Sequence, residues 1–241
     1  MTDSAPNVPP RAEPDAAAPA RDWLLLEAGL LILFSAAVLA FPVYPEWLAK
    51  QTNALEAWGV VSLAWSVWLL ARNSVWGWVV GLVGVLIYTV VFYRYRLYGE
   101  VGLQAFYFLT SVQAIVIWLR WGPQEDERPV GRVTPRTLAL SGLVVVIATG
   151  LLALLLQRLR GDVVGWDAFT TVLSVTAHLY LMGRYLESWY LWIVVDTIYV
   201  PLYYSRGLSL TAVLYVVFLI LAVRGLLGWR ALYAQQHAQP T

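Results

Sequence analysis

Residues 189–203 read WYLWIVVDTIYVPLY, an apolar stretch that nevertheless carries one carboxylate, two tryptophans and three tyrosines. In a helix, five of these side chains follow one another at intervals of three, four, three and four positions, which places them on one face. They are Trp189, Trp192, Asp196, Tyr199 and Tyr203. An acid inside a membrane helix is costly unless it faces the bundle interior or water, so this face predicts a functional site.

The composition of the whole chain indicates an all-α polytopic membrane protein. Of its 241 residues, 60% are hydrophobic and 13% are charged, whereas soluble domains are nearer half apolar and a quarter charged. Apolar runs of about 20 residues are long enough to cross roughly 30 Å of hydrocarbon. Eight spans are predicted, at 23–41, 53–71, 76–95, 101–121, 133–158, 164–184, 187–204 and 209–229.

Several classes of site are excluded by residue counts. The chain has no cysteine and only two histidines, His178 and His237, so we expect no disulfide, no thiolate chemistry, no metal site and no cofactor. The net charge of +1 gives no basis for nucleic-acid binding. Residues 1–22, rich in Pro and Ala, are interpreted as a disordered leader. Ten of the 16 Lys and Arg residues fall on the side of the two termini, which favours cytoplasmic termini.

Two blocks of the chain look alike. Residues 53–122 and 163–230 each contain three predicted spans, with a tryptophan pair at the start of the middle span and a glycine-containing turn after it. The span within 123–162 has no aromatic residue and supplies the extra crossing that two blocks of the same direction need. An additional helix and loop at 23–52 precede this three-plus-one-plus-three core, and a polar tail at 231–241 follows it. Parallel repeats of this kind are a transporter architecture, with substrate held between them near mid-membrane.

From about Asn53 to Arg230 the chain resembles the Pnu vitamin transporters. The pattern W-x-x-W-x-x-x-(N/D)-x-x-x-x-x-x-Y carries the resemblance, at Trp189, Trp192, Asp196 and Tyr203. Supporting residues are Glu56, Asn73, Trp76, Trp78, Leu103-Gln104 and Gly228-Trp229-Arg230.

That resemblance implies facilitated uptake of nicotinamide riboside, a vitamin B3 precursor, across the inner membrane of a bacterium. It implies no ion coupling, and trapping of the product by a cytoplasmic kinase. It also implies a fold similar to the sugar-transporting SWEETs, and a homotrimer. Asp196 stands where some members of the family have Asn, so thiamine and riboflavin remain alternative substrates.

The predicted binding residues come from three helices. The Trp and Tyr side chains on the face with Asp196 would stack on a flat, cationic ring of the ligand, and Asp196 would accept hydrogen bonds from the ligand. Ser174 and His178 belong to a second polar stripe, together with Asp167 and Thr171, which either completes the pocket or joins helices. Gln104, which can donate and accept, is assigned to the ligand with the support of the resemblance.

Two other functions compete with transport. A serine hydrolase would use Ser174 and His178, which are one helical turn apart. No glycine-rich setting accompanies Ser174, so no catalytic residue and no enzyme are predicted. A purely structural subunit would leave the acidic face without a purpose. Gly77, Gly81 and Gly84 predict close helix packing instead of a site.

Overall fold

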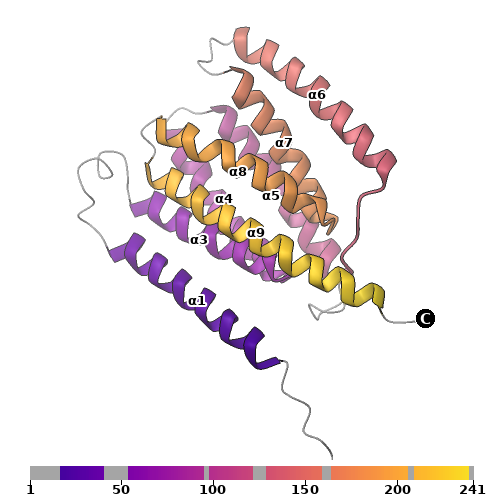
Figure 1. Cartoon of the computed structure of the whole chain (residues 1–241). Coiled ribbons are helices and arrows are strands. Elements are labelled where there is room, and N and C mark those ends of the chain that lie inside the picture. Colours follow the sequence, from indigo (N-terminus) through magenta and orange to yellow (C-terminus); the bar gives the residue numbers. More distant parts are fainter. Residues whose placement is uncertain are drawn as a thin grey trace, which may run out of the picture. The chain divides into compact units, whose positions relative to one another are not determined.

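The computed structural model describes residues 17–40, 54–94, 98–121, 129–158, 164–205 and 209–238. Within these ranges the chain is helical apart from turns and one isolated backbone bridge, which confirms the all-α prediction. The helices are α1 (Ala17–Ala40), α3 (Ala54–Ala71), α4 (Trp76–Arg94), α5 (Tyr98–Arg120), α6 (Pro135–Arg158), α7 (Val164–Met182), α8 (Glu187–Ser205) and α9 (Ser209–Ala238) (Figure 1).

These helices coincide with the predicted spans except at the two ends of the chain. The helix α1 begins at Ala17, inside the segment predicted as a leader, and α9 continues past 230 to Ala238, through most of the predicted polar tail. Residues 1–16 of the predicted leader and residues 122–128 of the predicted linker lie outside the described residues.

Five described segments are long and apolar enough to cross a membrane: Ala54–Ala71, Trp76–Arg94, Val101–Arg120, Pro135–Leu155 and Leu210–Ala238. Two shorter apolar segments are Leu24–Ala40 and Ala168–Met182. The helix α8 is not in either group, and it is the helix with Asp196 in its middle. A total of eight crossings therefore stays a prediction.

Residues 1–37 and 38–241 form two separate units. In the first unit α1 is an apolar helix in which the Ser35 hydroxyl donates to the Leu31 carbonyl at 2.7 Å. Such a bond back to the preceding turn satisfies a hydroxyl inside an apolar helix.

In the larger unit, six helices form a closed ring. The contacts run from α3 to α4, α5, α7, α8 and α9, and from α9 back to α3, while α6 packs against α7. If α3, α4 and α5 are exchanged with α7, α8 and α9 in that order, every contact in the ring falls on another contact of the ring. A two-fold relation between the two blocks requires this pattern of contacts. The pairing supports two repeats; their likeness to sugar transporters and the domain boundaries stay predictions.

A constant spacing of 111 positions relates three pairs of residues in the two blocks. The pairs are Asn73 and Arg184, Trp78 and Trp189, and Trp118 and Trp229. The first pair has positive φ, 62° and 58°, in the turns α3–α4 and α7–α8. Asn73 therefore lies in the turn between α3 and α4. The four tryptophans of the other two pairs make the same edge-on contact within each block. The ring centroids are 5.6 Å apart for Trp78 and Trp118 in the first block and 5.4 Å apart for Trp189 and Trp229 in the second.

The helices α3 and α4 lie unusually close because glycines line their contact. A Cβ at Gly77 would lie 2.5 Å from Leu70 Cγ and 2.8 Å from its backbone nitrogen. The Ser66 hydroxyl on α3 also donates to the Gly77 carbonyl at 2.8 Å. The close packing predicted from the glycine spacing is confirmed, and it brings α3 side chains to the inner wall of the ring.

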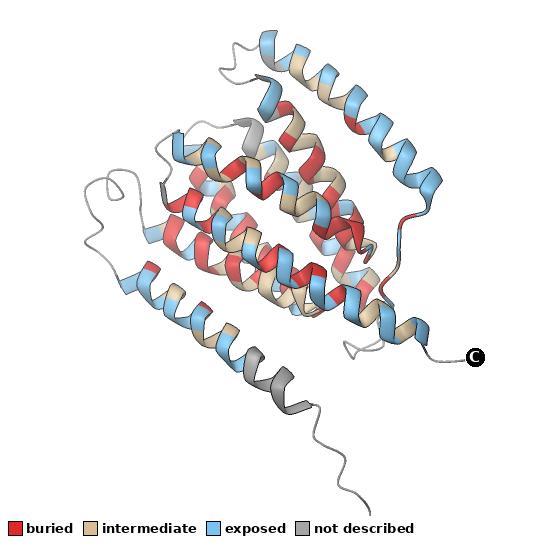
Figure 2. Ribbon diagram, viewed as in Figure 1, coloured by how far each residue is buried: buried red, intermediate tan, exposed pale blue. Residues whose placement is uncertain are grey.

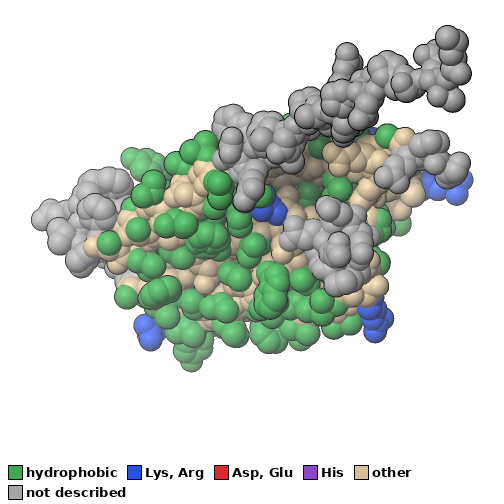
Figure 3. Space-filling view, turned by 90° about the horizontal axis from the view of Figure 1, so that it is seen from below, with side chains coloured by type: hydrophobic (Ala, Val, Ile, Leu, Met, Phe, Trp, Pro, Cys, Tyr) green, Lys and Arg blue, Asp and Glu red, His purple; other side chains and the backbone are tan. Residues whose placement is uncertain are grey.

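The helices differ in how much of their surface is buried. The inward sides of α3, α4, α8 and α9 are buried, whereas α6 shows mostly exposed residues (Figure 2). Only 6% of the apolar part of α6 is buried, and its outer side carries leucines and valines suited to lipid. One face of the molecule carries many hydrophobic side chains, with Lys and Arg at a few places among them and at the rim (Figure 3).

Candidate functional site

A cavity of about 170 Å³ lies inside the ring of six helices. It is comparable to a cavity of about 150 Å³ that holds one benzene molecule. Its wall is largely aromatic and aliphatic. The side chains that carry nitrogen, oxygen or an aromatic ring are Ser66, Trp78, Gln104, Tyr107, Ser111, His178, Trp189, Trp192, Asp196, Tyr215 and Phe218.

A second cavity of about 60 Å³ adjoins the first and shares part of its wall. The shared residues are Leu63, Gln104, Tyr107, Tyr215 and Phe218. The remaining lining comes from the ends of α4 and α8 and the beginnings of α5 and α9. The two cavities therefore follow one another along the helix axes, with Gln104 and Tyr215 between them.

The structure brings seven of the eight predicted binding residues to these cavities. Trp189, Trp192, Asp196, Gln104 and His178 line the larger one, and Gln104, Tyr199 and Tyr203 line the smaller one. Ser174 is 1% exposed and lines neither of the two. The side chain of Asp167 lies outside the described residues. That any of these residues contacts a ligand stays a prediction.

Four polar atoms on residues of the larger cavity are buried without a hydrogen-bond partner among the described residues. Two are donors, Trp78 Nε1 and Trp189 Nε1, and two are acceptors, Gln104 Oε1 and Asp196 Oδ1. Buried polar groups in proteins are normally hydrogen-bonded, because leaving one unpaired costs about 1–3 kcal/mol. These four atoms belong to residues of the cavity wall, and each leaves hydrogen-bonding capacity unused among the described residues.

His178 is held by aromatic residues and by one hydroxyl. Its Nε2 lies 2.9 Å from Thr110 Oγ1, and its ring is 4.8 Å from that of Tyr107 and 5.2 Å from that of Trp78. Because the Thr110 hydroxyl donates to the Phe106 carbonyl at 2.7 Å, we assign the proton of the His178 bond to Nε2. The imidazole thus ties α7 to α5.

The arrangement of Ser174 and His178 does not resemble a hydrolase. The Ser174 Oγ has no hydrogen-bond partner among the described residues, and Nε2 of His178 is bonded to Thr110. A nucleophilic serine needs its hydroxyl against a histidine base. The second polar stripe instead contributes one wall residue, His178, and a buried hydroxyl.

One end of the larger cavity is closed by tryptophans. Besides the two edge-on pairs, Trp118 and Trp229 approach each other to 6.2 Å between centroids, so the contacts join both blocks. The guanidinium of Arg184, whose residue is 0% exposed, lies 5.1 Å from the Trp118 ring centroid and 5.9 Å from that of Trp229. Cation–π contacts of this kind stabilise a desolvated arginine. We call Trp78, Trp118, Trp189, Trp229 and Arg184 the tryptophan end.

The opposite end is built from tyrosines. Tyr215 lies 4.8 Å from Tyr199 and 5.1 Å from Tyr203 between ring centroids, and its ring is within 9° of parallel to that of Tyr203. Nearby, the Thr211 hydroxyl donates to Glu56 Oε1 at 3.2 Å, which joins α9 to α3. We call Tyr199, Tyr203 and Tyr215 with the smaller cavity the tyrosine end.

Sequence reasoning missed several wall residues as members of the site, among them Trp78, Tyr107 and Tyr215. Trp78 supported the repeat and the family resemblance, and Tyr107 and Tyr215 were not assigned to the ligand. The constant spacing of 111 would have found two of them, because it pairs Trp78 with Trp189 and Gln104 with Tyr215.

Comparison with known proteins gives consistent matches. Residues 53–231 match the nicotinamide mononucleotide transporter family. The chain is 24% identical to the nicotinamide riboside transporter PnuC of Escherichia coli strain K12 over 201 residues, covering 73% of this chain and 84% of that protein. It is 29% identical to the riboflavin/roseoflavin transporter RibM of Streptomyces davaonensis over 205 residues, covering 82% and 91%.

The crystal structure of the vitamin B3 transporter PnuC superimposes with a TM-score of 0.70 and 25% identity, over 87% of this chain and 92% of that one. The family, these relatives and this structure are all named as transporters, in agreement with the prediction that the chain is not an enzyme. A family match over most of the chain and an aromatic cavity inside a helical ring lead to one conclusion: the chain belongs to the nicotinamide mononucleotide transporter family, the PnuC family of membrane transporters.

Proposed function

We propose that this transporter carries nicotinamide riboside and binds it in the larger cavity. The observation that carries the proposal is the carboxylate of Asp196, which is 2% exposed, has Oδ1 without a partner and lies on the wall of an aromatic cavity. A carboxylate away from water needs a cation or hydrogen-bond donors beside it. The pyridinium ring, carboxamide and ribose hydroxyls of nicotinamide riboside supply both.

The other wall groups suit the same ligand. The indole rings of Trp189 and Trp192 line the cavity and would attract a cationic ring stacked on them by about 0.5–2 kcal/mol. The unpartnered N–H groups of Trp78 and Trp189 would donate to the carboxamide or ribose oxygens, and Gln104 Oε1 would accept from a hydroxyl. Tyr199 and Tyr203 would then contact whichever end of the ligand reaches the smaller cavity.

Riboflavin is the second candidate, because RibM, a riboflavin/roseoflavin transporter, shares 29% identity with this chain. Its three fused rings need more room than the single pyridinium ring of nicotinamide riboside, and the larger cavity measures about 170 Å³. They are also uncharged, so they would leave Asp196 without a cation. Thiamine is cationic and so complements the charge of Asp196. It is therefore the third ligand to compare in binding experiments.

The transport cycle that we propose follows the expectations for the family. Substrate moves down its gradient without ion coupling, with both termini in the cytoplasm of a bacterium, and a cytoplasmic kinase traps the product by phosphorylation. The protein assembles as a homotrimer in the inner membrane. The Lys and Arg distribution supports the orientation, and the apolar outer surface supports the location.

Uptake into proteoliposomes tests the proposal. Vesicles that enclose a nicotinamide riboside kinase and ATP should accumulate labelled nicotinamide riboside, and unlabelled riboflavin should compete weakly. The Asp196→Ala variant should lose uptake, and its affinity for nicotinamide riboside should fall at least about tenfold. The reason is that a hydrogen bond to a charged group contributes about 1.5–3 kcal/mol. Equal uptake by Asp196→Ala and the parent would overturn the site assignment. Stronger competition by riboflavin would make riboflavin the substrate.

The matched variant Asp196→Asn separates charge from shape. Nicotinamide riboside and its reduced, uncharged dihydropyridine form differ little in size. The parent should prefer the cation, and Asp196→Asn should lose most of that preference while it still binds. An unchanged preference would show that Asp196 acts through hydrogen bonding alone.

A further inference from the structure

The segment before α6, residues 129–134, crosses the tryptophan end of the molecule; we call it the strap. Its Gly131 pairs with the α7–α8 turn: Gly131 N–H donates to the Arg184 carbonyl, and the Leu186 N–H donates to the Gly131 carbonyl, both at 3.0 Å. Val130 N–H also donates to Gln236 Oε1 on α9 at 3.0 Å. The strap is therefore bound to α7, α8 and α9.

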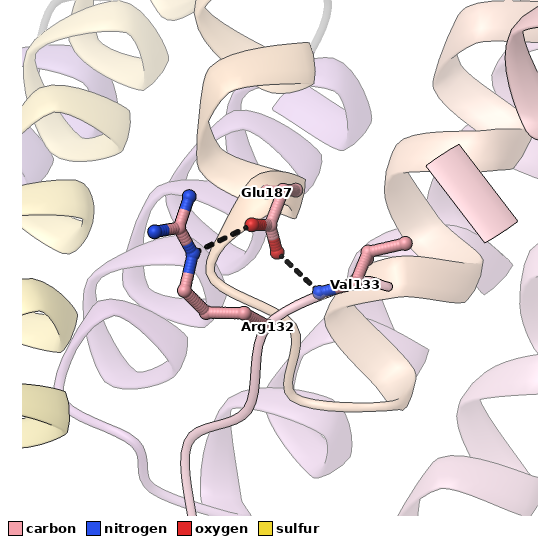
Figure 4. A network of polar contacts seen from close by, with 3 residues as sticks. All are labelled: Arg132, Val133 and Glu187. Carbon is pink, nitrogen blue, oxygen red and sulfur yellow. Dashed lines mark hydrogen bonds and ion pairs between the residues drawn. The ribbon is translucent and has the colours of Figure 1, made fainter. Parts of the chain in front are cut away.

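Glu187, the first residue of α8, holds the strap through both carboxylate oxygens (Figure 4). Oε1 accepts from Arg132 Nε at 3.0 Å, and Oε2 accepts from the Val133 backbone N–H at 2.9 Å. The hydrogen bond to Glu187 and the charge of Glu187 raise the pKa of Arg132, so Arg132 stays charged throughout the physiological range. The Glu187 side chain is only 11% exposed, and the Arg132 side chain is 58% exposed.

The strap carries one apolar side chain into the closed end. Val130 is 1% exposed and belongs to the same buried cluster as Trp118, Trp189 and Trp229. It thus fills space where the tryptophans of the two blocks meet. A path out of the larger cavity at this end requires these tryptophans to part, and Val130 to leave with the strap.

The first block lacks the counterpart of this attachment. The position 111 residues before Glu187 is Trp76, whose side chain is 63% exposed and has no acceptor oxygen. Among the described residues, the one isolated backbone bridge is that between Gly131 and Tyr185, beside the α7–α8 turn. The backbone hydrogen bonds of the strap therefore join it to the second block.

We propose that Glu187 is a positioning residue of the transport cycle: by tying the strap to α8 it keeps Val130 in place and the tryptophan end closed. Two hydrogen bonds to one carboxylate hold the strap, so removing the charge weakens both at once. Glu187 itself lies on neither cavity wall. Its loss should change how often this end opens and leave the contacts to the ligand in place. This inference rests on transport as such and does not depend on which vitamin is carried.

Sided thiol labelling tests the proposal, because the chain has no cysteine of its own. A Ser111→Cys variant places one thiol on the wall of the larger cavity. A membrane-impermeant reagent is applied from the side on which α9 ends, and separately from the other side. The addition of Glu187→Gln should raise labelling from the α9 side about tenfold, the effect of losing about 1.4 kcal/mol from the closed state. Labelling from the other side should not rise.

Two further variants make the result decisive. Arg132→Gln keeps the Val133 bond and removes only an exposed partner, so it should raise labelling less than Glu187→Gln. Arg136→Gln, a change at an exposed arginine in the first turn of α6, is the matched control and should leave labelling unchanged. Unchanged labelling in Glu187→Gln, or an equal rise from both sides as in local unfolding, would overturn the proposal. A chain that is labelled as expected yet carries no nicotinamide riboside would overturn only the proposed substrate.

Discussion

The two ends of the cavity are closed by different kinds of packing. At the tryptophan end four indoles from both blocks pack together, Arg184 lies beside Trp118 and Trp229, and Val130 of the strap belongs to the same buried cluster. At the tyrosine end Tyr203 and Tyr215 stack, with Tyr199 tilted against both, beside a second cavity of about 60 Å³. The first end is solid and held by charge and aromatic contacts, whereas the second contains free space and hydroxyl groups.

This difference indicates which end opens with less cost. Dense packing of large side chains loses many contacts when it separates, because protein interiors are packed as tightly as organic crystals. A wall beside an existing cavity has fewer contacts to lose. We therefore expect the tyrosine end to open more readily, and the tryptophan end to require the coordinated movement of the strap and α8.

The largest expected effect concerns Trp229, which is 1% exposed and touches Trp118, Trp189 and Arg184. Trp229→Ala should lower the free energy of unfolding by about 3–5 kcal/mol, since it removes a fully buried aromatic ring. Thermal denaturation in detergent measures this. The control Trp58→Ala changes a side chain that is 56% exposed and should have a small effect. Similar losses for both variants would contradict a specially packed tryptophan end.

A smaller effect is expected from adding a methyl group at Gly225. Its Cβ would lie 2.8 Å from atoms of the Trp189 indole, so Gly225→Ala should destabilise the protein by about 1–3 kcal/mol and slow transport. Gly102→Ala on α5 is the matched control, because a Cβ there meets nothing within 4 Å. Thermal denaturation and uptake rates measured on the two variants decide the matter. An unaltered Gly225→Ala protein would mean that Trp189 can move aside.

The smallest effect on stability is expected at the tyrosine end. Tyr88 is 4% exposed and lines the smaller cavity, and Thr211 is the hydrogen-bonding neighbour of its hydroxyl. Tyr88→Phe should change the free energy of unfolding by about 1 kcal/mol or less, because it removes a single hydrogen bond between two hydroxyl groups. If substrate passes this end, KM for uptake should rise severalfold. A large loss of stability with no change in KM would indicate a structural role for that hydroxyl.

Much of the architecture could be predicted because the signals are local. Apolar runs identified the helices to within a few residues, and the spacing of Gly77, Gly81 and Gly84 predicted close packing that the structure shows. The face with Trp189 and Asp196 turned inward, as the helical interval of three and four positions requires. The end of α9 was misjudged because polar residues after 230 continue a helix as readily as they form a tail.

The rest of the site depends on which helices become neighbours. Tyr215 lies opposite Gln104 because α9 and α5 face the same cavity, and no local pattern in either helix indicates this. Ser174 and His178 share a helix face, yet the packing of α5 and α7 left His178 on the wall, bonded to Thr110, and Ser174 away from it. Such outcomes follow from contacts between distant segments.

By itself the sequence determined a helical membrane protein, its family motif and one inward face with a buried acid. These properties depend on residues within a few turns of one another, so their spacing is enough. Only the tertiary structure decided which aromatic rings meet that acid, how the cavity divides in two, and that the strap before α6 closes one end through Glu187. Those properties depend on long-range packing, in which residues such as Val133 and Glu187 meet because the helices between them fold back.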